Sequence, residues 1–288
     1  MSDSLKQCYD LLNKTGRSFG ITISCLDEEL RDAMCVYYLV QRAVDTVEDD
    51  MTIPYDIKVA MLFSFEKYLL DPTWRYTESS DEYAVVLTSF PYITRALGEL
   101  NNKYRNIISE MASRVGKAMV AFVGKEFITI EDVSEYCRRV TSLVCMGLVD
   151  LFVAAGLEAE VQDKSLMLES FLLVQKTNIL RDFTKDWNSG RLYYPRDVWS
   201  KYVNSPGDFL KPENFDKGVE CVNELAADAL QHVIPYLQFL RSLRNPSVIT
   251  FCGIHQILDR SRLAKTECRS IQDMCRRILL HLELVQPV

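Results

Sequence analysis

Histidine, glycine and proline are scarce in this chain of 288 residues. Only three histidines occur, at positions 232, 255 and 281, and they form no metal-ligand spacing with the nine cysteines, which argues against a zinc site. The 11 glycines and nine prolines do not cluster, so neither a low-complexity tract nor a flexible linker divides the chain. We therefore expect one domain over residues 1–288, large enough to bury a sizeable core.

The chain also lacks an excess of basic charge. Its formal net charge is −7, whereas nucleic acids are bound by clustered Lys and Arg, so we expect no nucleic-acid partner. The cysteines form no C-x-x-C pair, and no signal peptide precedes them. These absences predict reduced thiols in a cytoplasmic protein.

Long apolar runs are nearly absent as well. The most apolar stretch, residues 140–157, is interrupted only by Asp150, and it allows either a membrane-spanning helix or a buried core helix. Because Thr141, Ser142 and Gly147 suit a buried helix, we favour the core helix. We expect no transmembrane anchor in this chain.

Apolar residues recur at intervals of three and four, and strict alternation is missing, so the pattern predicts an all-α fold. The predicted helical stretches are residues 5–12, 30–47, 57–70, 107–123, 133–157, 166–183, 215–243 and 248–263. Asp71-Pro72 ends one helix and Phe90-Pro91 opens another. Residues 187–212 collect Gly and Pro, which predicts a long loop of the kind that often binds ligands.

Two groups of carboxylates follow apolar helical runs. Asp45, Glu48 and Asp49 stand at i, i+3 and i+4, and Asp182 and Asp186 repeat the four-residue spacing. Such pairs are common on solvated faces, but carboxylates next to buried helices are costly unless a cation compensates them. Together they predict Mg²⁺ held between two aspartate-bearing helices, with diphosphate oxygens filling its remaining positions.

The strings that contain these acids resemble motifs of the squalene synthase family, the squalene/phytoene synthases. They are RAVDTVEDDMTI at residues 42–53 and QKTNILRDF at residues 175–183. Further likeness occurs at residues 17–19, 195–199 and 243–248, so it covers about residues 5–255 and leaves 256–288 as a divergent C-terminal segment. The resemblance implies a single class I isoprenoid-synthase helical bundle with a central hydrophobic cavity.

The resemblance also implies a reaction. A magnesium-dependent prenyltransferase of this family ionises farnesyl diphosphate, joins two molecules head to head through presqualene diphosphate, and reduces the product to squalene with NADPH. We accordingly expect a monomer in the cytoplasm or at the surface of the endoplasmic reticulum, with peripheral membrane contact.

Individual residues receive roles from the same resemblance. The implied magnesium ligands are Asp45, Glu48, Asp49, Asn178, Asp182 and Asp186. The implied diphosphate-binding residues are Arg17, Ser18, Arg42, Arg181, Lys185 and Arg191. The implied catalytic residues are Tyr38, Arg139, Asp45, Asp49, Asp182 and Asp186. The implied cavity residues are Phe19, Val140, Leu143, Leu148 and Gln175. From the residues alone, salt bridges to neighbouring Asp or Glu are the favoured role of the arginines, and Tyr38 suits the core as well as a catalytic role.

Three departures from the family pattern bear on the reaction. Arg139 stands where the family has a catalytic tyrosine, and a protonated arginine is no general base, although it suits a diphosphate. Lys185 replaces an additional acid before Asp186. Residues 256–262 bring polar groups into a segment expected to line the hydrocarbon cavity.

The family pattern continues with basic residues associated with NADPH and a membrane anchor, whereas this chain ends at Val288 after a predicted amphipathic helix over residues 271–284. The use of NADPH therefore stays open. Two alternatives also stay open, a single-substrate terpene synthase that makes a sesquiterpene and a catalytically silent relative that binds prenyl diphosphate.

Overall fold

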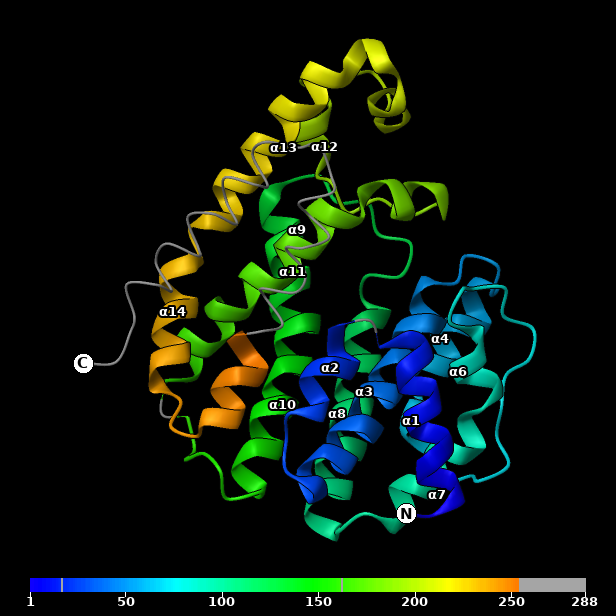
Figure 1. The fold of residues 1–288 in the computed structure, drawn as a ribbon. Helices are drawn as coiled ribbons and strands as arrows, with labels where there is room; N and C mark the ends of the chain where they lie inside the picture. Colours follow the sequence, from blue (N-terminus) through cyan, green and yellow to red (C-terminus); the bar gives the residue numbers. More distant parts are fainter. Residues whose placement is uncertain (17, 162, 254–288) are drawn as a thin grey trace. The chain divides into compact units, whose positions relative to one another are not determined.

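The computed structural model describes residues 1–16, 18–161 and 163–253 (Figure 1). Every regular element within these ranges is a helix, which confirms the predicted all-α fold. Arg17 and the predicted features at residues 256–262 and 271–284 lie outside the described residues. Contacts divide the chain into two compact units, and the expectation of one domain stays a prediction.

The first unit contains Met1–Lys125, Leu143–Glu160 and residues 243–253. Its helices are α1 (Asp3–Thr15), α2 (Ser18–Ser24), α3 (Glu28–Asp49), α4 (Tyr55–Phe63), α5 (Phe65–Tyr68), α6 (Ala84–Thr88), α7 (Phe90–Glu99), α8 (Asn102–Val120) and α10 (Ser142–Ala154), the last of which starts one residue before the unit. Helix α3 packs against α1, α4, α6, α7 and α8. Residues 33–40 are therefore buried on all sides of the helix, as their apolar character favours.

The second unit contains Glu126–Ser142 and Val161–Ser242. Its helices are α9 (Ile130–Tyr136), the π-helix η1 (Cys137–Thr141), α11 (Lys164–Asn188), α12 (Arg196–Trp199), the 3₁₀ turns η2 (Pro206–Leu210) and η3 (Pro212–Asn214), α13 (Phe215–Leu230) and α14 (Val233–Ser242). Helix α11 packs against η1, α13 and α14. This long helix is therefore the element that organises the second unit.

Several predicted helices prove to be interrupted. The stretch at 57–70 is split at Ser64 into α4 and α5, and the stretch at 215–243 is split into α13 and α14. The predicted loop at 187–212 contains α12 and η2, and Arg196 N and Asp197 N bind the carbonyls of Phe127 and Ile128. Helix α7 does begin at Phe90, as Phe90-Pro91 predicted.

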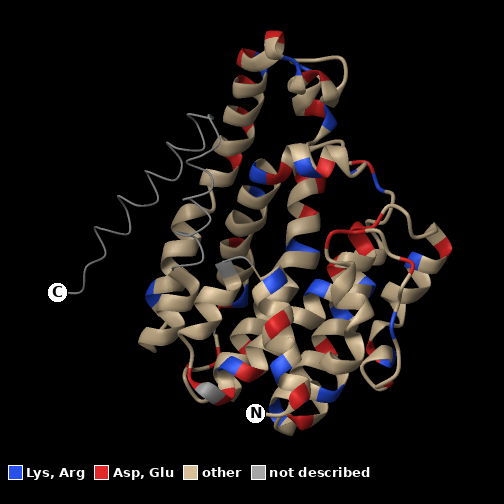
Figure 2. Cartoon of the chain, turned by 45° about the vertical axis from the view of Figure 1, so that its right-hand side comes forward, with Lys and Arg blue, Asp and Glu red and all other residues tan. Residues whose placement is uncertain are grey.

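The described helices carry mixed charge. In the view of Figure 2, acidic and basic residues are interspersed along them. None of the helices in the described part of the chain combines the length and the apolar character that crossing a bilayer requires.

Candidate functional site

The first acidic motif forms the last turns of α3. Asp45, Glu48 and Asp49 precede the C-cap residue Asp50, and the last turn contains no basic residue. Carboxylates at a helix C-terminus oppose the helix dipole and reduce helix stability. Their position indicates a role other than stabilising the fold.

Arg42 lies one turn before these acids and partly compensates them. Its Nη1 atom is 3.6 Å from Asp45 Oδ2, and its Nε donates to the Tyr38 hydroxyl at 3.2 Å. Its Cζ lies over two aromatic rings, 5.5 Å from the centroid of Tyr38 and 4.8 Å from that of Tyr83. The Tyr38 hydroxyl itself donates to Thr15 O at 2.7 Å, and this hydrogen bond fixes the ring that the Arg42 guanidinium contacts.

Asp50 follows the motif but has a different environment. It is buried, and its carboxylate accepts from Thr52 N at 2.8 Å, Thr52 Oγ1 at 2.6 Å, Ser79 Oγ at 2.6 Å and Ser80 N at 3.1 Å. Burial alone would raise the pKa of Asp50, but these hydrogen bonds hold it below its usual value. Asp50 is thus a buried structural carboxylate.

The second acidic motif occupies the last two turns of α11. Asp182 accepts two hydrogen bonds from Arg181, Nε to Oδ1 at 2.8 Å and Nη2 to Oδ2 at 2.6 Å. Asp186 accepts from Arg191 Nη2 at 2.8 Å, and its carbonyl accepts from Arg191 N. Both motifs therefore end a long helix, and each contains aspartates paired with arginine.

The donor set of the two motifs fits magnesium, which prefers carboxylate oxygens. Among the described residues, no three His, Cys, Asp or Glu side chains converge, and Asp45, Asp182 and Asp186 each pair with a guanidinium. The carboxamide of Gln41, one turn before Asp45, adds a second observation. Its side chain is only 5% exposed, and neither its nitrogen nor its oxygen has a hydrogen-bond partner. A buried amide without partners is costly, so a polar partner beside the first motif would be favourable.

Arg139 lies in the π-helix η1, an element that sequence periodicity did not predict. Its side chain is 51% exposed, and its Nε is 3.9 Å from Glu135 Oε1. Single π-helical turns inside α-helices occur often at functional sites. The role of Arg139 stays a prediction.

The other predicted site residues divide between the two units. Phe19 lies 5.2 Å from Tyr38 between ring centroids, which brings a predicted cavity residue to the Arg42 cluster. Ser18 begins α2, Val140 is buried, and the remaining four are half-buried, namely Leu143, Leu148, Gln175 and Asn178. Lys185 is also half-buried, on the last turn of α11. The sharing of one ligand by the two motifs stays a prediction.

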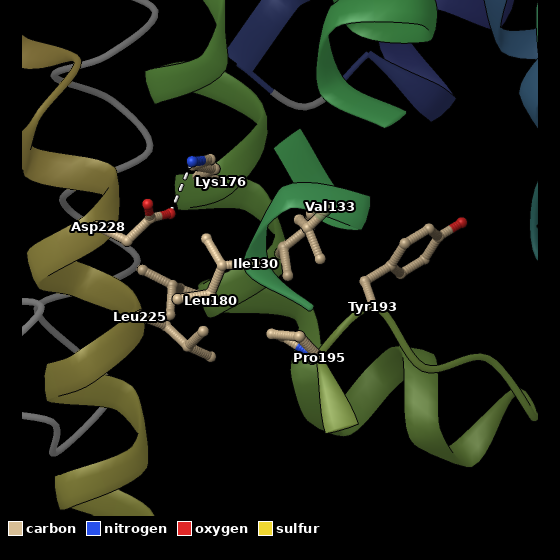
Figure 3. Close-up of a pocket in the computed structure, with 9 residues that line it drawn as sticks. Ile130, Val133, Lys176, Leu180, Tyr193, Pro195, Leu225 and Asp228 are labelled. Carbon is tan, nitrogen blue, oxygen red and sulfur yellow. Dashed lines mark hydrogen bonds and ion pairs between the residues drawn. The ribbon is translucent and has the colours of Figure 1, made fainter. Parts of the chain in front are cut away.

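The second unit contains a buried ion pair that the sequence did not predict. Lys176, 5% exposed, donates to Asp228 Oδ2 at 2.6 Å, and its Nζ is 3.1 Å from His232 Nε2. Figure 3 shows this pair at one end of a cavity whose other walls include Ile130, Val133 and Leu225. The cavity has a volume of about 20 Å³, which suits about one water molecule and excludes a prenyl chain. No local spacing could reveal the pair, since its members are far apart in sequence.

His232 makes the stability of this region depend on pH. Burial and the charge of Lys176 lower the pKa of His232 below its ordinary value of 6.5. The unfolded chain therefore takes up a proton first, and we expect the free energy of unfolding to fall as pH decreases through about 6.5. Urea unfolding between about pH 7.5 and 5.5 measures this slope. His232→Gln should flatten it, and an unchanged slope would contradict the assignment.

A larger apolar cleft lies between α11, η2 and α13 in the second unit. Its volume is about 200 Å³, and its walls include Leu180, Phe183, Phe209 and Val219. The five predicted cavity residues line neither this cleft nor the smaller cavity, so their role stays a prediction.

Comparisons with known proteins identify relatives of this chain. The family model for squalene/phytoene synthase matches residues 12–283. Squalene synthase from Rattus norvegicus is 42% identical over 266 residues, which are 92% of this chain and 64% of the rat protein. The chain thus spans less than two thirds of the length of the curated relatives it matches.

Solved structures show the same fold. A structure of TcSQS with the ligand BPH1237 has a TM-score of 0.85 and 34% identity, covering 100% of this chain and 93% of that one. Squalene synthase HpnC from Alicyclobacillus acidocaldarius has a TM-score of 0.64 and 17% identity, covering 93% and 94%, which is a likeness of fold alone. The fold is that of the all-α isoprenoid synthases. From the matched family model and the identity to its members, the chain belongs to the squalene/phytoene synthase family.

Proposed function

We propose that this protein is a magnesium-dependent prenyltransferase that ionises farnesyl diphosphate and condenses two molecules head to head through presqualene diphosphate. Family membership supports this activity. The observation that carries it is the pair of acidic motifs at the ends of α3 and α11, where the helix dipole disfavours carboxylates unless a cation is bound.

We propose that Asp45, Asp49, Asp182 and Asp186 hold magnesium, assisted by Glu48 and Asn178. When bound, the metal supplies Lewis-acid stabilisation of the departing diphosphate. The ion pairs between arginine and aspartate also have a role in the proposed reaction. Arg42, Arg181 and Arg191 neutralise the aspartates while no ligand is bound, and they turn to phosphate oxygens when the aspartates take metal.

The remaining predicted residues complete the proposal. Arg17, Ser18 and Lys185 add contacts to the diphosphate, and Tyr38 supports Arg42 beside the reacting end of the prenyl chain. Arg139, protonated at neutral pH, binds phosphate oxygens rather than removing a proton. The apolar side chains that we assign to the prenyl pocket are Phe19, Val140, Leu143 and Leu148, with Gln175 as its polar member.

We propose a second, reductive step that uses NADPH. NADPH serves only the conversion of presqualene diphosphate to squalene. We propose a monomeric protein that works in the cytoplasm, at the surface of the endoplasmic reticulum, where its apolar product enters the membrane.

Product analysis tests the proposed function. The protein is incubated with farnesyl diphosphate and Mg²⁺, with and without NADPH, and released diphosphate and extracted lipids are measured. We expect presqualene diphosphate without NADPH and squalene only with it. A sesquiterpene as the sole product, or no diphosphate release under either condition, would refute the condensation.

A further inference from the structure

We propose that Asp50 and Tyr83 are positioning residues that hold Arg42 ready for the substrate diphosphate. The inference rests on the proposed function, in which Arg42 binds that group. It adds two residues of the first unit, neither of which has been assigned a role in binding.

Asp50 is held in place by four hydrogen bonds. Both carboxylate oxygens accept two hydrogen bonds, Oδ1 from Thr52 N and Oγ1, and Oδ2 from Ser79 Oγ and Ser80 N. The side chain is 3% exposed. A carboxylate so occupied and buried is poorly suited to a metal, although it continues the acidic motif of α3. Its hydrogen bonds instead join the end of α3 to the segment at residues 79–80.

Further hydrogen bonds connect this segment to Tyr83. Ser79 Oγ accepts from Asp81 N at 3.3 Å, and Asp81 Oδ1 accepts from Tyr83 N at 2.7 Å. Tyr83 is also the residue before α6, a helix that packs against α3. A continuous series of short-range hydrogen bonds thus fixes the backbone of Tyr83 relative to Asp50.

The ring of Tyr83 contacts the guanidinium of Arg42. The Tyr83 centroid is 4.8 Å from Arg42 Cζ, closer than the Tyr38 centroid at 5.5 Å. The two rings and the Asp45 carboxylate restrict the guanidinium from several directions. A long arginine side chain loses rotamer entropy when it binds a ligand, so restricting it in advance favours binding.

A matched pair of variants tests the inference. Tyr83→Leu removes the ring, and Tyr83→Phe keeps the ring while removing the hydroxyl. We expect Tyr83→Leu to weaken the binding of inorganic diphosphate with Mg²⁺, and to raise the KM for farnesyl diphosphate, by about tenfold with little change in kcat. Tyr83→Phe keeps the ring over Arg42 and should therefore retain most of the binding.

A second readout does not depend on substrate. The Nε–H signal of Arg42 in ¹⁵N NMR reports the mobility of the guanidinium, and it should become more mobile in Tyr83→Leu and in Asp50→Asn, but not in Tyr83→Phe. Equal binding by Tyr83→Leu and the wild type, or equal defects in the Leu and Phe variants, would overturn the positioning role alone. A wild-type protein that binds no diphosphate would overturn the proposed function and this inference with it.

Discussion

Asp45→Ala and Asp182→Ala should each abolish magnesium-dependent release of diphosphate from farnesyl diphosphate, with a loss of about 10³-fold or more. Each change removes one proposed metal ligand from a motif that, in the proposed reaction, offsets a highly charged leaving group. It also releases an arginine, because Asp45 pairs with Arg42 and Asp182 pairs with Arg181. A steady-state assay of diphosphate release at several magnesium concentrations measures the effect.

The control for these variants is Asp10→Ala, which removes an exposed carboxylate from α1. It should leave the rate unchanged. Thermal unfolding of all three variants separates lost chemistry from lost folding, and we expect transitions close to that of the wild type. Full activity in both motif variants would show that these aspartates do not hold the metal.

Gly116→Ala should strongly lower the free energy of unfolding. Helices α4 and α8 approach so closely that a Cβ atom on Gly116 would lie 2.3 Å from Leu62 O and 3.3 Å from Leu62 C. These are backbone atoms, so they cannot move aside without separating the helices. Overpacking of this kind costs about 3 kcal/mol of unfolding free energy. Urea unfolding monitored by circular dichroism measures the loss.

Gly98→Ala is the matched control, because it makes the same substitution in a neighbouring helix of the same unit. A Cβ atom on Gly98 would have no neighbour within 4 Å, and the residue lies in α7. Alanine has the better helix propensity, so we expect this variant to be more stable by up to about 1 kcal/mol. Equal stability of the two variants would contradict the close packing of α4 on α8.

Periodicity was sufficient for the long helices because they bury apolar side chains, whereas the short helices α2, α6 and α12 lie outside the predicted stretches. The long stretches of α3, α8 and α11 followed from it, and the start of α7 followed from the Phe90-Pro91 pair. The breaks were harder to predict. Ser64 and the π-helical turn at Cys137–Thr141 leave the apolar pattern intact, because tertiary packing determines where the backbone changes conformation.

The candidate site was predictable where its chemistry is local in sequence. The carboxylates of Asp45 and Asp49 share one helix face because of their spacing, and the pairing of Arg181 with Asp182 joins adjacent residues. Tyr83 was not predictable, since no sequence pattern brings it to Arg42 across about 40 positions. The unpartnered amide of Gln41 likewise became visible only from its burial in the folded chain.

Calorimetric titration of an unreactive thio-analogue of farnesyl diphosphate, with Mg²⁺ and with EDTA, tests most directly whether the acidic motifs bind a metal that carries the substrate. We predict binding with Mg²⁺ that is lost with EDTA and lost in Asp45→Ala and Asp182→Ala. Equal affinity with and without the metal would contradict it.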